Sequence, residues 1–302
     1  MKKKSTIVFH VLMMLAAGCA GNTDPQIPEE PVSYENAVVS YLGPEGTYTQ
    51  EACGRFFENQ GAYVPYPTVN EAVEALINGE SGYAVIPQEN TIGGAVVDYV
   101  DVLIAQTGVV VIGEVELTIN QNLLVLPGTS LKEIRTVYSH SQGIVQGAAW
   151  LQENLPEAEV IVVSSTAEGA RIVAETGDPA CAAIASAACA EVYGLEILAE
   201  GIQNNTRNRT RFYVLSCGEP LTAPSDRIAF IASGDAEDLP ALMAGMEKLK
   251  MKLVAIHDRP LKTELGQYCW VIECSDGTYQ EYLKLTKNSP FVFRWLGSFP
   301  VK

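Results

Sequence analysis

The sequence is poor in the residues that build metal centres and nucleophilic active sites. It contains three histidines, His10, His140 and His257, which are scattered along the chain. Its seven cysteines form no Cys-x-x-Cys pair, so no zinc site is expected. A Gly-x-Ser-x-Gly elbow, a His-Glu-x-x-His helix and a Walker loop are also missing. We therefore expect no metal site and no catalysis by any of these motifs.

Positive charge is scarce as well. The chain has 20 Lys and Arg residues against 36 Asp and Glu residues, a formal net charge of −16. It has no basic stripe with interleaved aromatic residues, which excludes a general nucleic-acid or anionic-membrane surface. A small anion needs a locally basic site. Residues 204–212, NNTRNRTRF, offer one, because Arg207, Arg209 and Arg211 alternate directly before an apolar strand-like run.

No apolar run reaches the roughly 20 residues that a membrane-spanning helix needs. Residues 7–17 are apolar apart from His10, and a basic KKK segment precedes them, as in a signal peptide. Residues 15–19, LAAGC, resemble a bacterial lipoprotein processing site, which would make Cys19 the lipid-bearing first residue. Cleavage after Ala20 and a structural N-terminal helix are the alternatives.

We therefore expect residues 1–18 to be a signal peptide and the polar, proline-rich residues 19–36 to be a flexible tether. The protein would be exported and held at a membrane only through a lipid on Cys19. If the signal is not used, the protein is cytoplasmic. Most other cysteines lie in apolar runs, where free cysteine behaves as a small buried side chain.

The rest of the chain alternates strand-like and helix-like segments. Continuous apolar runs such as YAVIP at 83–87 predict buried strands, and the helical spacing of apolar residues in 69–80 predicts a covering helix. This order predicts an α/β domain at 37–217 with two doubly wound lobes. The lobes comprise about 37–113 with 202–216, and about 114–200. Residues 226–302 show the βαββαβ order of a ferredoxin-like domain.

The predicted strand ends are rich in glycine, hydroxyl and amide side chains. Thr47, Asn90, Ser139 and Ser165 each follow an apolar strand-like run, and several of these ends open a helix. Helix N-termini present free N–H groups and a positive dipole end, which favour carboxylates. Taken singly, each such residue is explained as a helix cap. Because several strand ends share this composition, we expect an inter-lobe cleft that binds a small carboxylate.

Six segments resemble, in order and spacing, the motifs of the prephenate dehydratase family, which includes prephenate and arogenate dehydratases. The resemblance extends over residues 38–216. It is carried by residues 43–52 (GPEGTYTQEA), 86–96 (IPQENTIGGAV), 137–146 (VYSHSQGIVQ), 165–170 (STAEGA), 182–186 (AAIAS) and 208–212 (NRTRF).

The resemblance implies a two-lobed, periplasmic-binding-protein-like catalytic domain that acts on prephenate, or on arogenate. Prephenate loses CO₂ and its ring hydroxyl to give phenylpyruvate, and aromatisation drives the reaction without a cofactor. Thr210 would donate a hydrogen bond to the leaving oxygen, and Arg211 would fork onto a substrate carboxylate. Phe212 would pack beneath them. The other substrate-binding residues implied by the motifs are Thr47, Glu89, Asn90, Thr91, Ser139 and Gln142.

The C-terminal segment resembles the ACT-type regulatory domain of the same family. His257, Asp258, Arg259 and Pro260 stand where the family has Glu-Ser-Arg-Pro, and residues 237–239 (EDL) stand where it has Gly-Ala-Leu. These elements bind phenylalanine in the family, so we expect weak inhibition by phenylalanine or none. The apolar runs at 228–232 and 268–274 suggest a sheet covered by a second chain, as a homodimer or a dimer of dimers.

Several positions depart from the family motifs. Gln88 replaces an Ile, Gly93 replaces a Glu, and Arg209 replaces a common Tyr, His or Val. Thr210 and Asn90 are retained, so activity is expected. An exported, non-catalytic binding protein that uses the same cleft for a small carboxylate is the alternative.

Overall fold

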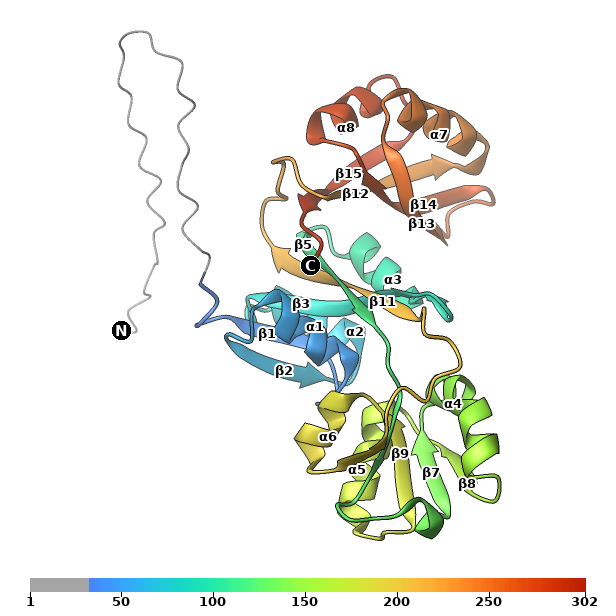
Figure 1. Cartoon of the computed structure of the whole chain (residues 1–302). Coiled ribbons are helices and arrows are strands. Elements are labelled where there is room, and N and C mark those ends of the chain that lie inside the picture. Colours follow the sequence, from blue (N-terminus) through green and yellow to red (C-terminus); the bar gives the residue numbers. More distant parts are fainter. Residues whose placement is uncertain (1–32) are drawn as a thin grey trace, which may run out of the picture. The chain divides into compact units, whose positions relative to one another are not determined.

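The computed structural model of the protein describes residues 33–302 (Figure 1). The predicted signal peptide, Cys19 and most of the predicted tether lie outside the described residues. Within residues 33–302, no helix is long and apolar enough to cross a membrane. Three sheets organise this part of the chain.

The first sheet has the strand order β2-β1-β3-β11-β5, and the short β4 pairs with β3. β1, β3, β5 and β11 are largely buried because helices and other strands cover them, whereas β2 and β4 are more exposed. The Thr68 side chain caps the second helix by accepting a hydrogen bond from the Glu71 N–H at 3.1 Å. The elements are β1 (Val38–Leu42), α1 (Tyr48–Phe56), β2 (Ala62–Tyr66), α2 (Val69–Ile77), β3 (Tyr83–Asn90), β4 (Gly94–Ala95), α3 (Val97–Ala105), β5 (Val109–Thr118) and β11 (Arg209–Cys217).

The second sheet has the order β10-β6-β9-β7-β8. Ser165 and Ser186 cap two of its helices, and Gly177 and Gly194 end them in the left-handed conformation that glycine adopts readily. The elements are β6 (Asn122–Val125), the short η1 (Leu131–Glu133), β7 (Thr136–Ser139), α4 (Ser141–Asn154), β8 (Glu159–Val162), α5 (Thr166–Thr176), β9 (Cys181–Ala185), α6 (Ala187–Tyr193) and β10 (Glu196–Ala199).

The α/β architecture is confirmed, and the first sheet extends a few residues beyond the predicted lobe boundary at about residue 113. β5 continues through Gly113 to Thr118 and pairs with β11 over its whole length. Gly113 lies within the strand. It leaves room for an aromatic ring, because a Cβ at this position would lie 2.1 Å from the Phe56 side chain. The chain passes to the second sheet only after Thr118.

The third sheet has the order β13-β14-β12-β15, which confirms the predicted βαββαβ fold. α7 and α8 cover one face, where Phe230, Trp270 and Tyr282 form the centre of an apolar cluster. The elements are β12 (Arg227–Asp235), the short η2 (Ala236–Asp238), α7 (Leu239–Lys248), β13 (Lys252–Pro260), β14 (Gln267–Ser275), α8 (Tyr279–Thr286) and β15 (Val292–Phe299).

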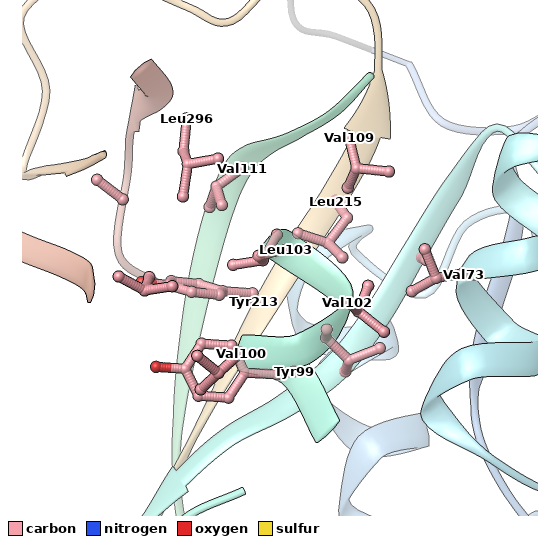
Figure 2. Close-up of a cluster of buried hydrophobic side chains, with 14 of the residues drawn as sticks. Val73, Tyr99, Val100, Val102, Leu103, Val109, Val111, Tyr213, Leu215 and Leu296 are labelled. Carbon is pink, nitrogen blue, oxygen red and sulfur yellow. The ribbon is translucent and has the colours of Figure 1, made fainter. Parts of the chain in front are cut away.

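The other face of the third sheet packs on the first sheet and α3. Figure 2 shows part of the shared cluster, in which Leu296 of β15 lies near Val111 of β5 and Tyr213 of β11. Side chains alternate along β12, so Phe230 contacts the helices and Ile231 joins the shared cluster. This chain therefore buries both faces of the third sheet itself, which leaves its edge for a second chain, and the pairing of two chains stays a prediction.

Candidate active site

A cavity of about 810 Å³ lies where the carboxyl ends of strands from the first two sheets approach each other. Strands β3 and β11, the loop after β1 and the N-terminal ends of α1, α4 and α5 all contribute to its wall. The predicted cleft is thus present. Its polar lining includes Thr47, Asn90, Gln121, His140, Gln142, Gln146, Ser165, Thr166, Glu168 and Thr210.

Asn90 orients the Thr210 hydroxyl. The Asn90 Oδ1 atom accepts hydrogen bonds from the Ile92 and Gly93 N–H groups, both at 2.9 Å. This fixes the amide, so Nδ2 must face Thr210, to whose Oγ1 it donates at 2.9 Å. Among residues 33–302, the Thr210 hydroxyl donates to no acceptor. Its proton is therefore available to a ligand in the cavity.

Asn208 is a second support that the sequence interpretation did not assign. It is fully buried, and its Oδ1 accepts from Asn90 Nδ2 at 2.9 Å and from the Thr91 hydroxyl at 3.1 Å. Thr91 also accepts from the Arg209 N–H at 3.0 Å, so it joins two strands and does not line the cavity. The period of two along an extended segment, which places residues 208 and 210 on one face, was the signal that could have identified Asn208.

Three helix N-termini meet at the cavity. Thr47 precedes α1, but its hydroxyl donates to the carbonyls of Leu42 and Pro44, so no side chain caps this helix. Ser165 caps α5 by accepting from the Glu168 N–H at 2.9 Å. His140 is the N-cap residue of α4, as Ser165 is of α5. Of the residues lining the cavity, none is lysine or arginine. Helix dipoles and N–H groups are therefore what this wall offers to carboxylates.

The remaining predicted residues divide into two groups. Gln142 and Phe212 line the cavity. Ser139 does not, because it is fully buried and its hydroxyl donates to the Ile184 carbonyl at 2.7 Å. The lining residues that were not predicted include Gln121 and Gln146, whose amides bond to each other at 3.2 Å. Gln146 follows Gln142 by one helical turn, a spacing that pointed to the same face of α4.

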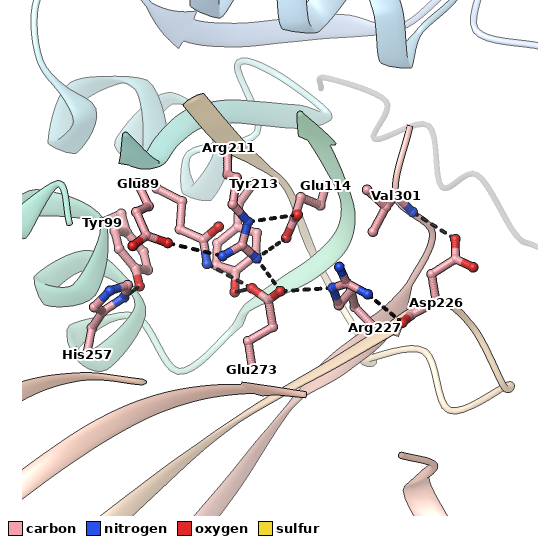
Figure 3. Close-up of polar contacts among 11 residues, drawn as sticks. Glu89, Tyr99, Glu114, Arg211, Tyr213, Asp226, Arg227, His257, Glu273 and Val301 are labelled. Atoms are coloured by element: carbon pink, nitrogen blue, oxygen red, sulfur yellow. Dashed lines mark hydrogen bonds and ion pairs between the residues drawn. The ribbon is translucent and has the colours of Figure 1, made fainter. Parts of the chain in front are cut away.

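Arg211 faces away from the cavity. Figure 3 shows its guanidinium among carboxylates, with Nε and Nη2 on Glu114 at 2.9 and 2.7 Å and Nη1 on Glu89 at 3.2 Å. It also pairs with Glu273 of the third sheet. Neighbouring residues of a strand point to opposite faces, so Thr210 and Arg211 cannot both reach the cleft. The assignment of Arg211 and Glu89 to substrate binding does not fit this structure.

The four predicted regulatory residues lie on β13, next to α3. His257 contacts the Tyr99 hydroxyl, and Arg259 Nε lies 2.6 Å from Asp101. Burial lowers the pKa of His257. These contacts pack this edge strand of the third sheet against α3, and the regulatory role of the four residues stays a prediction.

Two lobes around a polar cleft, with a hydroxyl donor and several helix N-termini in its wall, define a two-lobed α/β protein. A ferredoxin-like domain follows the two lobes, and this combination of domains further limits the class of protein. The chain belongs to the prephenate dehydratase family, because the model of that family, "Prephenate dehydratase", matches residues 39–219. The resemblance inferred from the motifs is confirmed.

Named relatives span most of the chain. It is 35% identical over 269 residues to the bifunctional chorismate mutase/prephenate dehydratase of Neisseria gonorrhoeae, covering 87% of this chain and 74% of that protein. It is 31% identical over 248 residues to the prephenate dehydratase of Bacillus subtilis, covering 78% and 87%. The solved structure of prephenate dehydratase from Arthrobacter aurescens in complex with L-Phe is similar, with a TM-score of 0.78 and 28% identity over 87% of this chain and 90% of that chain.

Proposed function

We propose that this protein is a prephenate dehydratase, which converts prephenate to phenylpyruvate in the biosynthesis of phenylalanine. Family membership over residues 39–219 supports this function. The observation that carries it is the Thr210 hydroxyl, which is held by Asn90 at 2.9 Å and keeps its proton free at the wall of the cavity.

In the proposed reaction, the bond between the ring carboxylate and the ring breaks as the ring hydroxyl leaves. The electron pair of the broken C–C bond enters the ring, which becomes aromatic, and CO₂ is released. The departing oxygen takes up one proton and leaves as water. Thr210 assists by donating a hydrogen bond to that oxygen as negative charge develops on it. The proton consumed comes ultimately from solvent.

The substrate is a dicarboxylate, and the cavity wall offers helix N-termini to hold it. The ends of α1, α4 and α5 come from both lobes, so they can fix the two ends of one molecule between them. Phe212 and Tyr66 add aromatic surface to the wall. Held in this way, the ring hydroxyl can be presented to Thr210 away from bulk water.

A turnover assay of the full chain with prephenate tests the proposal, with the enolised phenylpyruvate measured by its absorbance. We expect phenylpyruvate and CO₂ in equal amounts. Arogenate is assayed in parallel, because the same hydroxyl would leave. Calorimetric binding of prephenate without any product would contradict the enzymatic function and favour a carboxylate-binding protein that uses the same cleft.

We also propose that the protein is exported and carries a lipid on Cys19. The basic KKK segment, the apolar residues 7–17 and the LAAGC segment support this. We predict that Cys19→Ser abolishes labelling by a fatty acid in cells, with unchanged prephenate turnover in the lysate. Label that persists in the variant would exclude Cys19 as the attachment point.

We further propose that the third sheet and its helices form an ACT-type domain that pairs two chains and responds weakly to phenylalanine. β13 is an edge strand with Leu253 partly exposed, which suits strand pairing with a second copy. Glu237 and Asp238 place two carboxylates at the start of α7, where they repel the carboxylate of an amino acid. Sedimentation and calorimetry with phenylalanine test the two halves: a monomer, or micromolar binding, would contradict them.

A further inference from the structure

Two neighbouring residue pairs of the β3–β11 ladder point to opposite sides of the sheet. Asn90 is paired with Thr210, and Glu89 is paired with Arg211. The first pair faces the cavity, where its side chains bond at 2.9 Å. The second pair faces the third sheet, and its side chains meet at 3.2 Å. The position of Thr210 therefore depends on the residues that contact Arg211 and Glu89 on the side of the ladder that faces the third sheet.

Glu273 accepts hydrogen bonds from this side of the β3–β11 ladder. This residue belongs to β14, and its side chain is 1% exposed. It accepts from Gln88 Nε2 at 2.8 Å, from the Tyr213 hydroxyl at 2.6 Å and from the Arg211 guanidinium. Figure 3 shows Arg211 and Tyr213 converging on this one carboxylate. All three donors belong to β3 and β11, the two strands that present Asn90 and Thr210.

The contact is buried and charged, which makes it stiff. Arg211 is forked onto Glu114 of β5 on one side and paired with Glu273 on the other. Loss of one partner in such a buried network leaves an unpaired charge, so the groups are strongly held in place. Because Arg211 and Thr210 are consecutive residues of one strand, displacement of the guanidinium displaces the hydroxyl. A shift of about 1 Å in a catalytic group can lower a rate about 10²-fold.

We propose that Glu273, a residue of the C-terminal domain, is a positioning residue that sets the Thr210 hydroxyl through Arg211, Gln88 and Tyr213. The inference rests on the proposed function for what Thr210 does. Glu273 does not touch the cavity, since it lies on the opposite side of the β3–β11 ladder.

The first test is Glu273→Gln in the full chain, assayed with prephenate. The amide keeps the shape but loses the charge that faces Arg211 and, at 3.3 Å, Arg227 Nε of β12. We expect kcat to fall about tenfold or more, with KM within about twofold, because Thr210 is displaced while the cavity stays intact. The matched control is Asp101→Asn, the same carboxylate-to-amide change. It breaks the 2.6 Å ion pair with Arg259, which also joins the third sheet to the rest of the chain but does not involve β3 or β11. We expect its kcat within about twofold of the parent.

A double-mutant cycle separates positioning from general destabilisation. If Glu273 acts through Thr210, then Glu273→Gln in a Thr210→Val background changes kcat by less than about twofold. A full tenfold loss in that background would overturn the proposal. An unchanged kcat in Glu273→Gln, or an equal loss in Asp101→Asn, would also overturn it.

Hydrogen–deuterium exchange tests the same inference without relying on turnover. We expect faster exchange in the peptide spanning residues 208–214 for Glu273→Gln and no change for Asp101→Asn. If the parent protein fails to convert prephenate, the proposed function fails, but faster exchange confined to Glu273→Gln still supports the hold on β11. Unchanged exchange in that peptide overturns the inference whatever the activity.

Discussion

Thr210 is the residue on which the chemistry depends. We predict that Thr210→Val, which keeps the shape and removes the hydroxyl, lowers kcat for prephenate about 10²-fold, the usual worth of general acid help. The fold should tolerate the change, because the Asn90 amide keeps its bond to Asn208 at 2.9 Å. Steady-state kinetics and thermal unfolding measure the two effects. A variant with near-parental kcat would remove Thr210 from this role.

The ionisation of Glu114 offers a test of the pH dependence of stability, because the fold raises the pKa of this carboxyl. Burial raises its pKa to about 7, the nearby Glu273 adds to the rise, and Arg211 opposes it. The ordinary pKa of a glutamate is 4.5. Between about pH 4.5 and pH 7, the folded state therefore keeps a proton on Glu114 that the unfolded chain releases. This contribution to stability is complete below about pH 4.5 and is lost as the pH rises through about 7. The other ionisable groups in this polar cluster are Glu89, Tyr213 and Arg227.

We therefore predict that Glu114→Gln, which mimics the protonated acid, flattens the pH dependence of stability. Between about pH 5 and pH 8 the parent should lose at least about 1 kcal/mol more of its free energy of unfolding than the variant does. Urea titrations at both pH values provide the measurement. An equal loss in parent and variant would show that Glu114 is already ionised at pH 5.

At the scale of elements, the start of α4 depends on one glycine. A Cβ on Gly143 would lie 2.5 Å from Ser139 Oγ and 3.2 Å from Thr166 Cγ2. Ser139 cannot move aside easily, because its hydroxyl is bonded to the Ile184 carbonyl at 2.7 Å. The glycine thus lets the N-termini of α4 and α5 approach each other at the cavity.

We predict that Gly143→Ala pushes α4 outward and raises KM several-fold, with a loss of stability of about 1–3 kcal/mol from overpacking. Gly147→Ala on the same helix is the matched control. Its Cβ would meet only the ends of the Ile184 and Ile202 side chains, at 3.0 and 3.5 Å, and these can shift. Kinetics of both variants provide the check, and equal KM values would show that the start of α4 does not bind the substrate.

At the scale of the whole molecule, the C-terminal domain shares a hydrophobic core with the first sheet. The shared apolar cluster contains Tyr213 of β11 and Leu296 of β15, and the C-terminal residues bond to β5 through the N–H groups of Glu114 and Lys302. We predict that a chain ending at residue 217 loses cooperative unfolding and prephenate turnover, because Tyr213 and Arg211 lose their cover. Circular dichroism and sedimentation provide the measurement. A soluble fragment with a sharp thermal transition would contradict the prediction.

The sequence by itself determined the alternation of strands and helices, the βαββαβ order of the C-terminal domain, the family and the presence of Thr210 and Asn90 in one motif. These features are local: they follow from side-chain periodicity and from the spacing of residues within short segments. The caps at Ser165 and Ser186, and the glycines that end the same helices, are equally local.

Only the tertiary structure decided what lies on each face of those segments. The alternation along NRTRF shows that Thr210 and Arg211 point opposite ways, but not which of them meets the cleft. That depends on Glu114, Glu89 and Glu273, which three different strands bring to one face of β11. The apolar runs of β12 and β14 likewise predicted a covered sheet, but the cover of one face is the first sheet and α3 of the same chain and not a second chain. Burial of charge and apolar surface is a property of the assembled layers, so the partner of a face is settled only when distant strands pack against it.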